Sequence, residues 1–244
     1  MRKTKTLIVV PAYNEAKNIG HALDALLAHC AGIDILVVSD GSFDETADIA
    51  RTYPVRVVSH PCNMGYGAAL QTGYRFAVHA DYDLVVQFDG DGQHDARDVS
   101  IIIEGLETSV GDIVIGSRFM GDPNFSPGFL KMLAIRFFRG MIRWVTANRI
   151  SDPTSGLRGL RRPVFTYYAG FNRLPVDFPD ADFLIDASLR KWKIREVAIG
   201  NQQRTHGHSM HAGLKPIVYM FKVFLSILVI VLNYTLLERR TSHE

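Results

Sequence analysis

Cysteine, net charge and long apolar segments are all scarce in this chain of 244 residues. Cys30 and Cys62 are the only cysteines. Neither their number nor their spacing suggests a disulfide framework or a zinc site, so they fit a reduced cytosolic protein. The formal net charge is only +2, which gives no reason to expect a nucleic-acid partner. With 47% hydrophobic residues, the chain is long enough to bury one sizeable core.

The N-terminal residues lack the hydrophobic region of a secretory signal. The apolar run there, residues 7–10, is four residues long and ends at Pro11. A signal peptide needs about 7–15 apolar residues in this region. We therefore expect no secretory signal in this segment.

The first half of the chain alternates short apolar runs with helical patterns. Apolar runs of strand length occupy residues 6–10, 33–38, 55–60, 83–88 and 112–117, and helical patterns follow the first four at residues 14–30, 44–53, 67–80 and 96–107. This alternation predicts an α/β fold with a mostly parallel central sheet and helices on both faces. Ligands of such sheets bind beyond the carboxyl ends of the strands.

The segment DGDGQHD follows one of these apolar runs and crowds several carboxylates together. Carboxylates this close repel one another unless a cation lies between them. An EF-hand loop starting at Asp89 would need Gly and Glu where His94 and Ser100 stand, so a calcium site of that class is excluded. Asp89 and Asp91, with Gln93 as a third oxygen donor, instead predict a Mg²⁺ or Mn²⁺ site shared with a substrate phosphate. A polar turn without a ligand is the alternative.

Other polar loops carry helix-capping patterns. Ser42-x-x-Glu45 predicts a capping box that opens the following helix, and Asn14 stands where a helix cap belongs. The glycine-containing turn at residues 63–67 favours tight packing, with a phosphate cradle at a helix N-terminus as the alternative. Three late histidines match no standard metal-ligand spacing and predict a solvated or substrate-facing loop: His206, His208 and His211.

Residues 124–149 carry arginines within an otherwise apolar segment. Arg136, Arg139 and Arg143 recur at spacings of three and four, so they share one helix face. A basic amphipathic helix of this kind is typical of a membrane surface, and we expect the segment to face the membrane or the acceptor. An ordinary docked helix with a solvated basic face is the alternative.

Residues 214–244, which follow a predicted catalytic domain at residues 1–213, contain the most apolar stretch of the chain. Lys222 is the only charge in residues 217–237, but the longest uncharged run, residues 223–237, has 15 residues. A spanning helix needs about 20. We expect a membrane-associated helix that either tilts across the membrane or lies in its interface, followed by a short polar tail. A buried core helix is the alternative, and basic residues at both ends leave the orientation open.

Six segments form a specific pattern when they are taken in order: LIVVPAYNEAKNI, ILVVSDGSFDET, NMGYGAALQTG, LVVQFDGDGQHD, IGSRF and DPTSGLRGLRR. Over residues 6–212 this order resembles the inverting family-2 glycosyltransferases. The chain looks most similar to their polyprenyl-phosphate branch, which is like dolichol-phosphate mannose synthase. The resemblance implies the GT-A fold, with its Rossmann-like sheet, a nucleotide-sugar donor and a divalent cation, Mg²⁺ or Mn²⁺.

The resemblance also implies roles for individual residues. Positions that match donor-binding residues of the family are Pro11, Tyr13, Glu15, Asp40, Asp89, Asp91, Arg118 and Arg204. Positions that match its metal and diphosphate site are Asp89, Asp91 and Gln93. Arg118 matches an arginine near the phosphates of donor and acceptor, and Arg204 matches a late arginine that reaches the donor diphosphate. Asp91, Arg118 and Asp182 are the residues expected to act in catalysis.

Three positions depart from the family pattern. Ser39 replaces the first aspartate of the usual Asp-Asp-Gly-Ser, which leaves the base and sugar of the donor open. Ala96 replaces a common proline. Met210 stands where the synthase branch commonly has lysine, which weakens the expectation of an acceptor-phosphate site.

The expected function is metal-dependent transfer of a hexose, from GDP-mannose or a UDP-hexose, to a polyprenyl (undecaprenyl or dolichyl) phosphate at the cytoplasmic face of a membrane. The enzyme would be peripheral or anchored there by its C-terminal helix. One alternative is transfer to a hydroxyl of a glycan or glycolipid in cell-envelope polysaccharide synthesis, with Asp180 or Asp182 as the general base. A non-catalytic protein that binds nucleotide sugars is a third hypothesis, motivated by Ser39.

Overall fold

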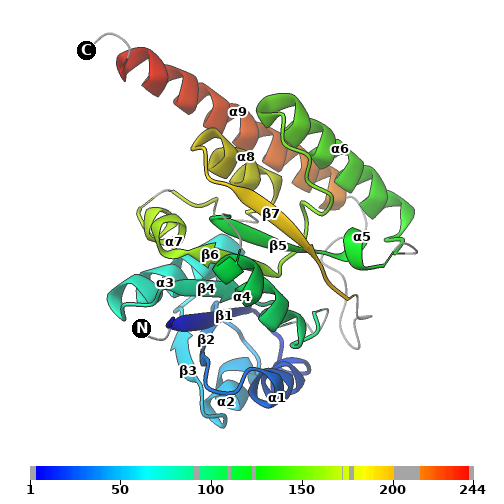
Figure 1. Cartoon of the computed structure of the whole chain (residues 1–244). Helices are drawn as coiled ribbons and strands as arrows, with labels where there is room; N and C mark the ends of the chain where they lie inside the picture. Colours follow the sequence, from blue (N-terminus) through cyan, green and yellow to red (C-terminus); the bar gives the residue numbers. More distant parts are fainter. Residues whose placement is uncertain are drawn as a thin grey trace.

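The computed structural model describes residues 4–90, 94–108, 111–122, 125–171, 173–175, 179–200 and 215–241 (Figure 1). The strands are β1 Thr6–Ala12, β2 Asp34–Ser39, β3 Arg56–Ser59, β4 Leu84–Gln87, β5 Ile113–Ser117, β6 Arg158–Arg161 and β7 Ile194–Ala198. The helices are α1 Ile19–His29, α2 Thr46–Arg51, α3 Tyr66–His79, α4 Asp98–Thr108, α5 Arg118–Gly121, α6 Phe129–Thr146, α7 Arg162–Tyr168, α8 Ala181–Leu189 and α9 Lys215–Thr241.

The described strands form one sheet in the order β3-β2-β1-β4-β6-β5-β7. Every pairing in it is parallel except the two made by β6, which runs antiparallel between β4 and β5. The predicted α/β fold with a mostly parallel sheet is therefore confirmed. The strand pattern of the first half did not reveal β6, which comes from residues far along the chain and still enters the middle of the sheet.

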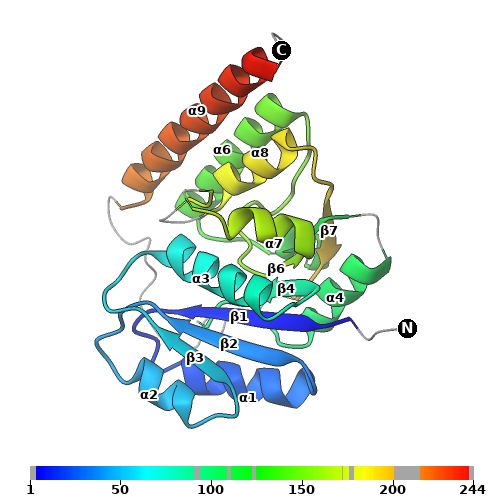
Figure 2. The ribbon, with the colours of Figure 1, turned by 90° about the vertical axis from the view of Figure 1, so that its left-hand side faces the viewer.

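Alternation of side chains along the strands divides the core into two layers. Val9 and Val85 point into a layer that contains α3, α6, α7 and α8. Ile8 and Val86 point into the other layer, with α1, α2 and α4. Figures 1 and 2 show helices on both sides of the sheet, as the sequence predicts. This sandwich buries strands on both faces, which explains why they read as continuous apolar runs.

Helix α9 packs along α8 and α6 at one end of the molecule (Figures 1 and 2). Val223 and Ile227 are buried in that contact, so the helix is docked on the protein body. Among the helices of the described ranges, none combines the length and apolarity that crossing a membrane requires.

Both helix-capping predictions for the β1 and β2 loops are wrong. Helix α1 begins at Ile19, and Asn14 instead has a φ of +55°. Helix α2 begins at Thr46, whose backbone N–H donates to Asp44 at 3.1 Å, so Ser42 does not cap it. The physical reason is that Asn14 and Ser42 are used to join the two loops: the Asn14 N–H donates to Ser42 Oγ at 3.1 Å.

Helix α6 confirms that residues 129–146 of the basic segment are helical, but its three arginines differ in environment. Arg136 and Arg143 are exposed. Arg139 is half-buried: its Nε donates to the Ser151 carbonyl at 2.7 Å and its guanidinium lies over the Phe119 ring at 4.3 Å.

Cys30 and Cys62 are both free cysteines, the first buried and the second exposed.

Candidate active site

The topology gathers the predicted site residues at one edge of the sheet. Tyr13 follows β1, Asp40 follows β2, Asp89 follows β4 and Arg118 follows β5. Because these strands run parallel, their carboxyl ends meet at the same edge. Three of the predicted site residues lie outside the described residues: Asp91, Gln93 and Arg204.

Two side chains, Tyr66 and His94, contact the carboxylate of Asp89. The Tyr66 hydroxyl donates to Oδ1 at 2.7 Å, and His94 Nε2 lies 3.6 Å from Oδ2. Burial would raise the pKa of Asp89, but the hydrogen bonds and charge that His94 and Tyr66 supply keep that pKa below its usual value. Burial and the Asp89 charge raise the pKa of Tyr66 in turn, so its hydroxyl stays a donor. Asp89 is therefore an ionised, oriented carboxylate at neutral pH.

Gly156 lies directly against that carboxylate. A Cβ added at this position would come within 1.8 Å of Asp89 Oδ2. Only glycine therefore leaves room for the carboxylate in its present position. The loop before β6 thus shapes the space around Asp89, although it is 67 residues away in sequence.

Arg118 and Asp152 form a buried ion pair. Arg118 donates to Asp152 through Nε at 2.7 Å and through Nη2 at 2.9 Å, and the Arg118 backbone N–H donates at 3.2 Å. Only 4% of the Arg118 side chain and 0% of the Asp152 side chain are exposed. Burial would lower the pKa of Arg118, but Asp152, with Asp89 and Asp180 nearby, raises that pKa. The guanidinium is a fixed positive charge.

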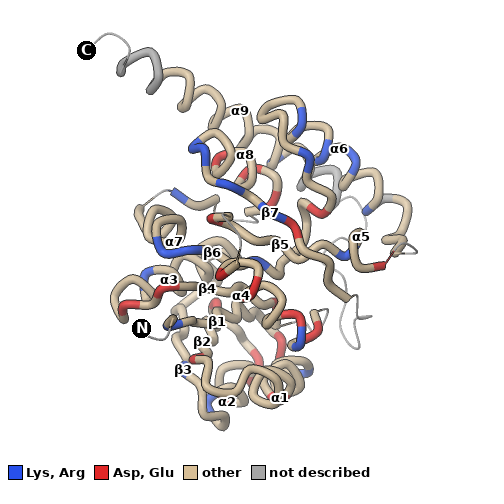
Figure 3. The backbone as a smooth tube through the Cα atoms, in the orientation of Figure 1, with Lys and Arg blue, Asp and Glu red and all other residues tan. Residues whose placement is uncertain are grey.

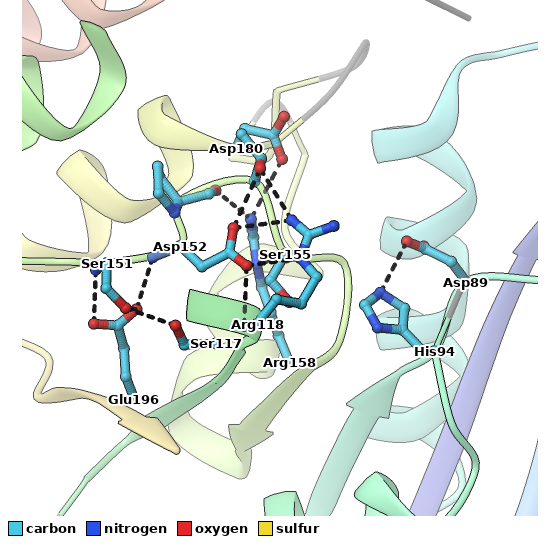
Figure 4. A network of polar contacts seen from close by, with 12 residues as sticks. Asp89, His94, Ser117, Arg118, Ser151, Asp152, Ser155, Arg158, Asp180 and Glu196 are labelled. Carbon is cyan, nitrogen blue, oxygen red and sulfur yellow. Dashed lines mark hydrogen bonds and ion pairs between the residues drawn. The ribbon is translucent and has the colours of Figure 1, made fainter. Parts of the chain in front are cut away.

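Nη1 of Arg118 makes no hydrogen bond within the described residues, because its other nitrogens take all the contacts. Figure 4 places this guanidinium on the side of Asp152 that faces Asp89. The site therefore offers one oriented carboxylate and one oriented cation with an uncommitted donor. Such a pair suits a ligand that carries phosphate and a metal ion.

Arg158, by contrast, is fully engaged. Its three nitrogens donate to backbone carbonyls of Ser155, Pro153 and Pro179, and Nη2 also lies 3.3 Å from Asp180 Oδ1. Its described contacts give Arg158 a structural role. It joins the loop that contains Gly156 to the N-terminus of α8, as Figure 4 shows.

Glu196 on β7 supports the ion pair from behind. Its carboxylate accepts from the backbone N–H groups of Ser151 at 2.7 Å and Asp152 at 2.9 Å, and from the Ser151 hydroxyl at 2.8 Å. Ser117, at the end of β5, bonds to the same hydroxyl at 2.6 Å. Asp152, which binds Arg118, is thus connected to the two neighbouring strands, β5 and β7.

The two candidate bases, Asp180 and Asp182, occupy different environments. Asp180 precedes α8 and contacts Arg158, and its charge reaches Arg118 and Tyr66. Asp182 is 2% exposed, and its carboxylate accepts from its neighbour's backbone N–H and from Ser226 Oγ of α9, both at 2.8 Å. Burial raises the pKa of Asp182 to about 6. In the described structure Asp180, and not Asp182, is the one of the two that joins the cluster.

Asp40 is turned into the protein. Its carboxylate accepts from the backbone N–H groups of Met64 at 2.9 Å and Gly65 at 2.8 Å, and it contacts His60 Nδ1 at 2.7 Å. These donors precede helix α3, so the anion at this helix N-terminus is the protein's own aspartate. The described contacts of Asp40 are structural, and its donor role stays a prediction. Of the other donor-site candidates, Pro11 is buried in β1 and Tyr13 is exposed beside it.

A metal site is only partly visible in the described residues. No group of three or more His, Cys, Asp or Glu side chains gathers around a common point in the described ranges. Of the three predicted ligands, Asp89 is the one that lies within the described ranges, and Gly156 keeps the space beside it free of a side chain. A hard divalent cation fits this donor chemistry, with Asp91 and Gln93 as its further predicted ligands.

Several residues of the cluster were not predicted from the sequence. Asp152, Gly156 and Arg158 lie in the segment DPTSGLRGLRR, which carried part of the family resemblance but no assigned roles. That resemblance was the available signal for them. Tyr66 lies in NMGYGAALQTG, which also carried part of the resemblance without a role for this residue. Glu196 gave no signal, because only the folded chain brings it to Ser151 and Asp152.

Known proteins are similar to this chain in sequence. The family model described as glycosyl transferase family 2 matches residues 7–168. An undecaprenyl-phosphate mannosyltransferase from Micrococcus luteus is 31% identical over 226 residues, covering 86% of this chain and 88% of that protein. A polyprenol monophosphomannose synthase from Mycolicibacterium smegmatis is 28% identical over 230 residues, covering 90% and 85%.

Solved structures share the fold. A glucosyl-3-phosphoglycerate synthase from Mycobacterium tuberculosis, crystallised with Mn²⁺, UDP-glucose and phosphoglyceric acid, superposes with a TM-score of 0.72 at 21% identity. The match covers 93% of this chain and 80% of that one. At this identity the likeness concerns the fold.

Proposed function

Because this chain belongs to glycosyl transferase family 2 and is a glycosyltransferase, we propose that it moves a hexose from a nucleoside-diphosphate sugar to a polyprenyl phosphate at the cytoplasmic face of a membrane. The observation that carries the proposal is the Arg118 guanidinium, whose Nη1 bonds to no described residue and which lies on the side of Asp152 that faces the oriented carboxylate of Asp89 (Figure 4). The donor is GDP-mannose or a UDP-hexose. Two relatives are named for sugar transfer to lipid phosphates, and this supports a lipid phosphate as the acceptor.

The chemistry follows from charge. Cleavage of the bond between sugar and phosphate leaves a nucleoside diphosphate, and the fixed Arg118 guanidinium stabilises the negative charge that grows there. Asp89, Asp91 and Gln93 would hold Mg²⁺ or Mn²⁺, which offsets the same charge when bound. A lipid phosphate is already anionic near neutral pH, so it attacks the anomeric carbon without a strong general base. The sugar inverts because attack comes from the opposite face.

The surface of α9 supports contact with a membrane. A stripe of exposed apolar side chains runs along the helix away from its buried face: Phe221, Leu225, Leu228, Val229, Leu232 and Leu236. Helix α6 adds the exposed Phe129, Leu133 and Trp144. Basic residues recur along the same helix (Figure 3). Apolar side chains beside Arg suit the interface of an anionic bilayer. We propose that α9 lies on the membrane, since its other face packs on α8.

A hydroxyl acceptor is the second candidate, and Asp180 favours it, since this carboxylate lies in the Arg118 cluster. A hydroxyl needs a base, whereas a phosphate does not. Asp180→Asn would then reduce turnover about 100-fold or more, within the range that general bases contribute. Asp182→Asn is the matched control, because the described contacts of Asp182 are with α8 and α9. Unchanged turnover in both variants supports the phosphate acceptor.

The direct test uses purified enzyme with a panel of labelled nucleotide sugars and undecaprenyl or dolichyl phosphate, followed by extraction into organic solvent. Undecaprenol without its phosphate is the matched acceptor control. Label in the organic phase only with the phosphorylated lipid supports the proposal. Label with the alcohol, or none with any lipid phosphate, overturns it. Asp89→Ala should abolish the transfer.

A further inference from the structure

The two carboxylate oxygens of Asp89 have different surroundings. The Tyr66 hydroxyl donates to Oδ1 at 2.7 Å. His94 Nε2 lies 3.6 Å from Oδ2, a longer and weaker contact than the one on Oδ1 (Figure 4). A Cβ at Gly156 would come within 1.8 Å of Oδ2 but 2.9 Å of Oδ1, so the absence of a side chain there benefits Oδ2 first. With 26% of the Asp89 side chain exposed, a small ion can reach its carboxylate from solvent.

The backbone that carries Tyr66 is fixed by the protein itself. Tyr66 is the first residue of α3, and the N–H groups of Met64 and Gly65 just before it donate to Asp40 at 2.9 Å and 2.8 Å. Gly65 has a φ of +99°, which glycine adopts without the strain that a Cβ would cause. The Tyr66 ring packs against the core layer that contains α3. The hydroxyl therefore reaches Asp89 from a rigid support, which holds the carboxylate in one orientation.

A carboxylate can hold a cation through one oxygen or through both. Ca²⁺ accepts both modes, because it takes about six to eight oxygen ligands in a flexible geometry. Mg²⁺ demands near-ideal octahedral geometry, and Mn²⁺ also suits octahedral oxygen sites. An oxygen that already accepts a short hydrogen bond has less electron density to offer a metal, and the donor group occupies space beside it. A carboxylate with one oxygen occupied in this way therefore favours the octahedral cations.

We infer that Tyr66 determines metal specificity: by occupying Oδ1 it leaves Oδ2 as the oxygen with which Asp89 binds a cation, and so favours Mg²⁺ or Mn²⁺ over Ca²⁺. The inference deepens the proposed function and rests on it, because a metal-dependent transfer is what makes Asp89 a ligand. Tyr66 acts through Asp89, so it is a positioning residue. Its removal should change the choice between cations, which a purely structural role would not do.

The test is Mn²⁺ binding to the full chain, followed by electron paramagnetic resonance, with Ca²⁺ as the competitor. Tyr66→Phe removes the hydroxyl and keeps the ring. It should reduce the preference for Mn²⁺ over Ca²⁺ at least about tenfold, within the range that groups orienting metal ligands contribute to affinity. Asp89→Ala should lose the Mn²⁺ signal, which would identify that signal with Asp89.

Tyr168→Phe is the matched control. The Tyr168 hydroxyl donates to Asp186 Oδ2 at 2.8 Å, so this variant breaks a tyrosine–aspartate bond of the same kind between α7 and α8. Its preference for Mn²⁺ over Ca²⁺ should equal that of the wild type.

Four results would overturn the inference. An unchanged preference in Tyr66→Phe would show that Oδ1 does not decide between the cations, and it would leave the proposed function standing. Equal losses of Mn²⁺ and Ca²⁺ affinity in Tyr66→Phe would give Tyr66 a general role in shaping the site. The same change of preference in Tyr168→Phe would make the effect one of overall structure. If the wild type does not bind Mn²⁺, or Asp89→Ala binds it equally well, the proposed metal-dependent function fails together with the inference.

Discussion

Asp152 binds the guanidinium of Arg118 through two side-chain hydrogen bonds, of 2.7 Å and 2.9 Å, in the buried interior behind the candidate active site. The two residues are 34 positions apart, one after β5 and the other before β6. The pair fixes the orientation of the Arg118 guanidinium, whose Nη1 bonds to no residue in the described ranges.

Removal of one partner of the ion pair should destabilise the protein strongly. Asp152→Ala leaves Arg118 buried without its counter-charge, which costs about 3–5 kcal/mol. The measurement is urea unfolding of the variant and the wild type. Asp48→Ala is the control, because it breaks an exposed pair with Arg51, which is worth about 1 kcal/mol or less.

The double variant Arg118→Met/Asp152→Ala should recover part of the stability, because no buried charge is then left alone. Equal losses of stability in Asp152→Ala and Asp48→Ala would contradict the importance given to the pair. Turnover should be lost both in Asp152→Ala and in Arg118→Met/Asp152→Ala.

Gly156→Ala should displace Asp89. The added Cβ would come within 1.8 Å of Asp89 Oδ2, so the carboxylate must move. We expect Mn²⁺ binding, followed by electron paramagnetic resonance, to weaken at least about tenfold, a size typical of altered metal-site geometry. Gly140→Ala is the matched control, because a Cβ there meets nothing within 4 Å. If both variants bind Mn²⁺ as the wild type does, Asp89 is not a ligand in this position.

Stability should depend on pH through Asp182. Burial raises its pKa to about 6, from an ordinary value near 4. Between these two pH values the folded protein keeps a proton on Asp182 that the unfolded chain has lost. The contribution of this proton to the free energy of unfolding is therefore present at pH 4 and disappears as the pH rises past 6. Its size is about 3 kcal/mol by the linkage between pKa and free energy.

The measurement is the difference in unfolding free energy between wild type and Asp182→Asn, from pH 4.5 to pH 7.5. The wild type should lose stability relative to Asp182→Asn as pH rises through this window, because asparagine carries no titrating proton. A difference that stays constant with pH would mean that Asp182 does not titrate there. Ser226→Ala should shift the midpoint upward, because the Ser226 hydroxyl stabilises the charged form.

The exposed stripe of α9 should govern binding to lipid. Leu228→Ser/Leu232→Ser replaces two exposed leucines and should weaken binding to phosphatidylglycerol vesicles, measured by co-sedimentation, about 100-fold, since each buried leucine contributes roughly 1.5 kcal/mol. Ile101→Ser is the control, because Ile101 is an exposed apolar residue on α4, in the layer opposite α8. Unchanged sedimentation of the double variant would refute the membrane role of this face.

Local patterns were sufficient for the first half of the fold. The apolar runs at residues 6–10 and 33–38 became β1 and β2, and the helical pattern at residues 67–80 became α3. Such segments are decided by side-chain periodicity within a few residues. The capping predictions at Asn14 and Ser42 failed because these side chains bond to each other's loop, which no local pattern encodes.

The order of the motifs determined from the sequence alone that the chain is a family-2 glycosyltransferase with Asp89 and Arg118 at one sheet edge, since parallel strands bring their carboxyl ends together. Only the tertiary structure decided that Asp152 holds Arg118, that Gly156 lies on Asp89, and that Asp180 is in the cluster while Asp182 is covered by α9. These contacts join residues from separate strands and helices. They depend on how β6 enters the sheet and how α9 packs on α8. The spacing of residues along the chain does not encode either arrangement.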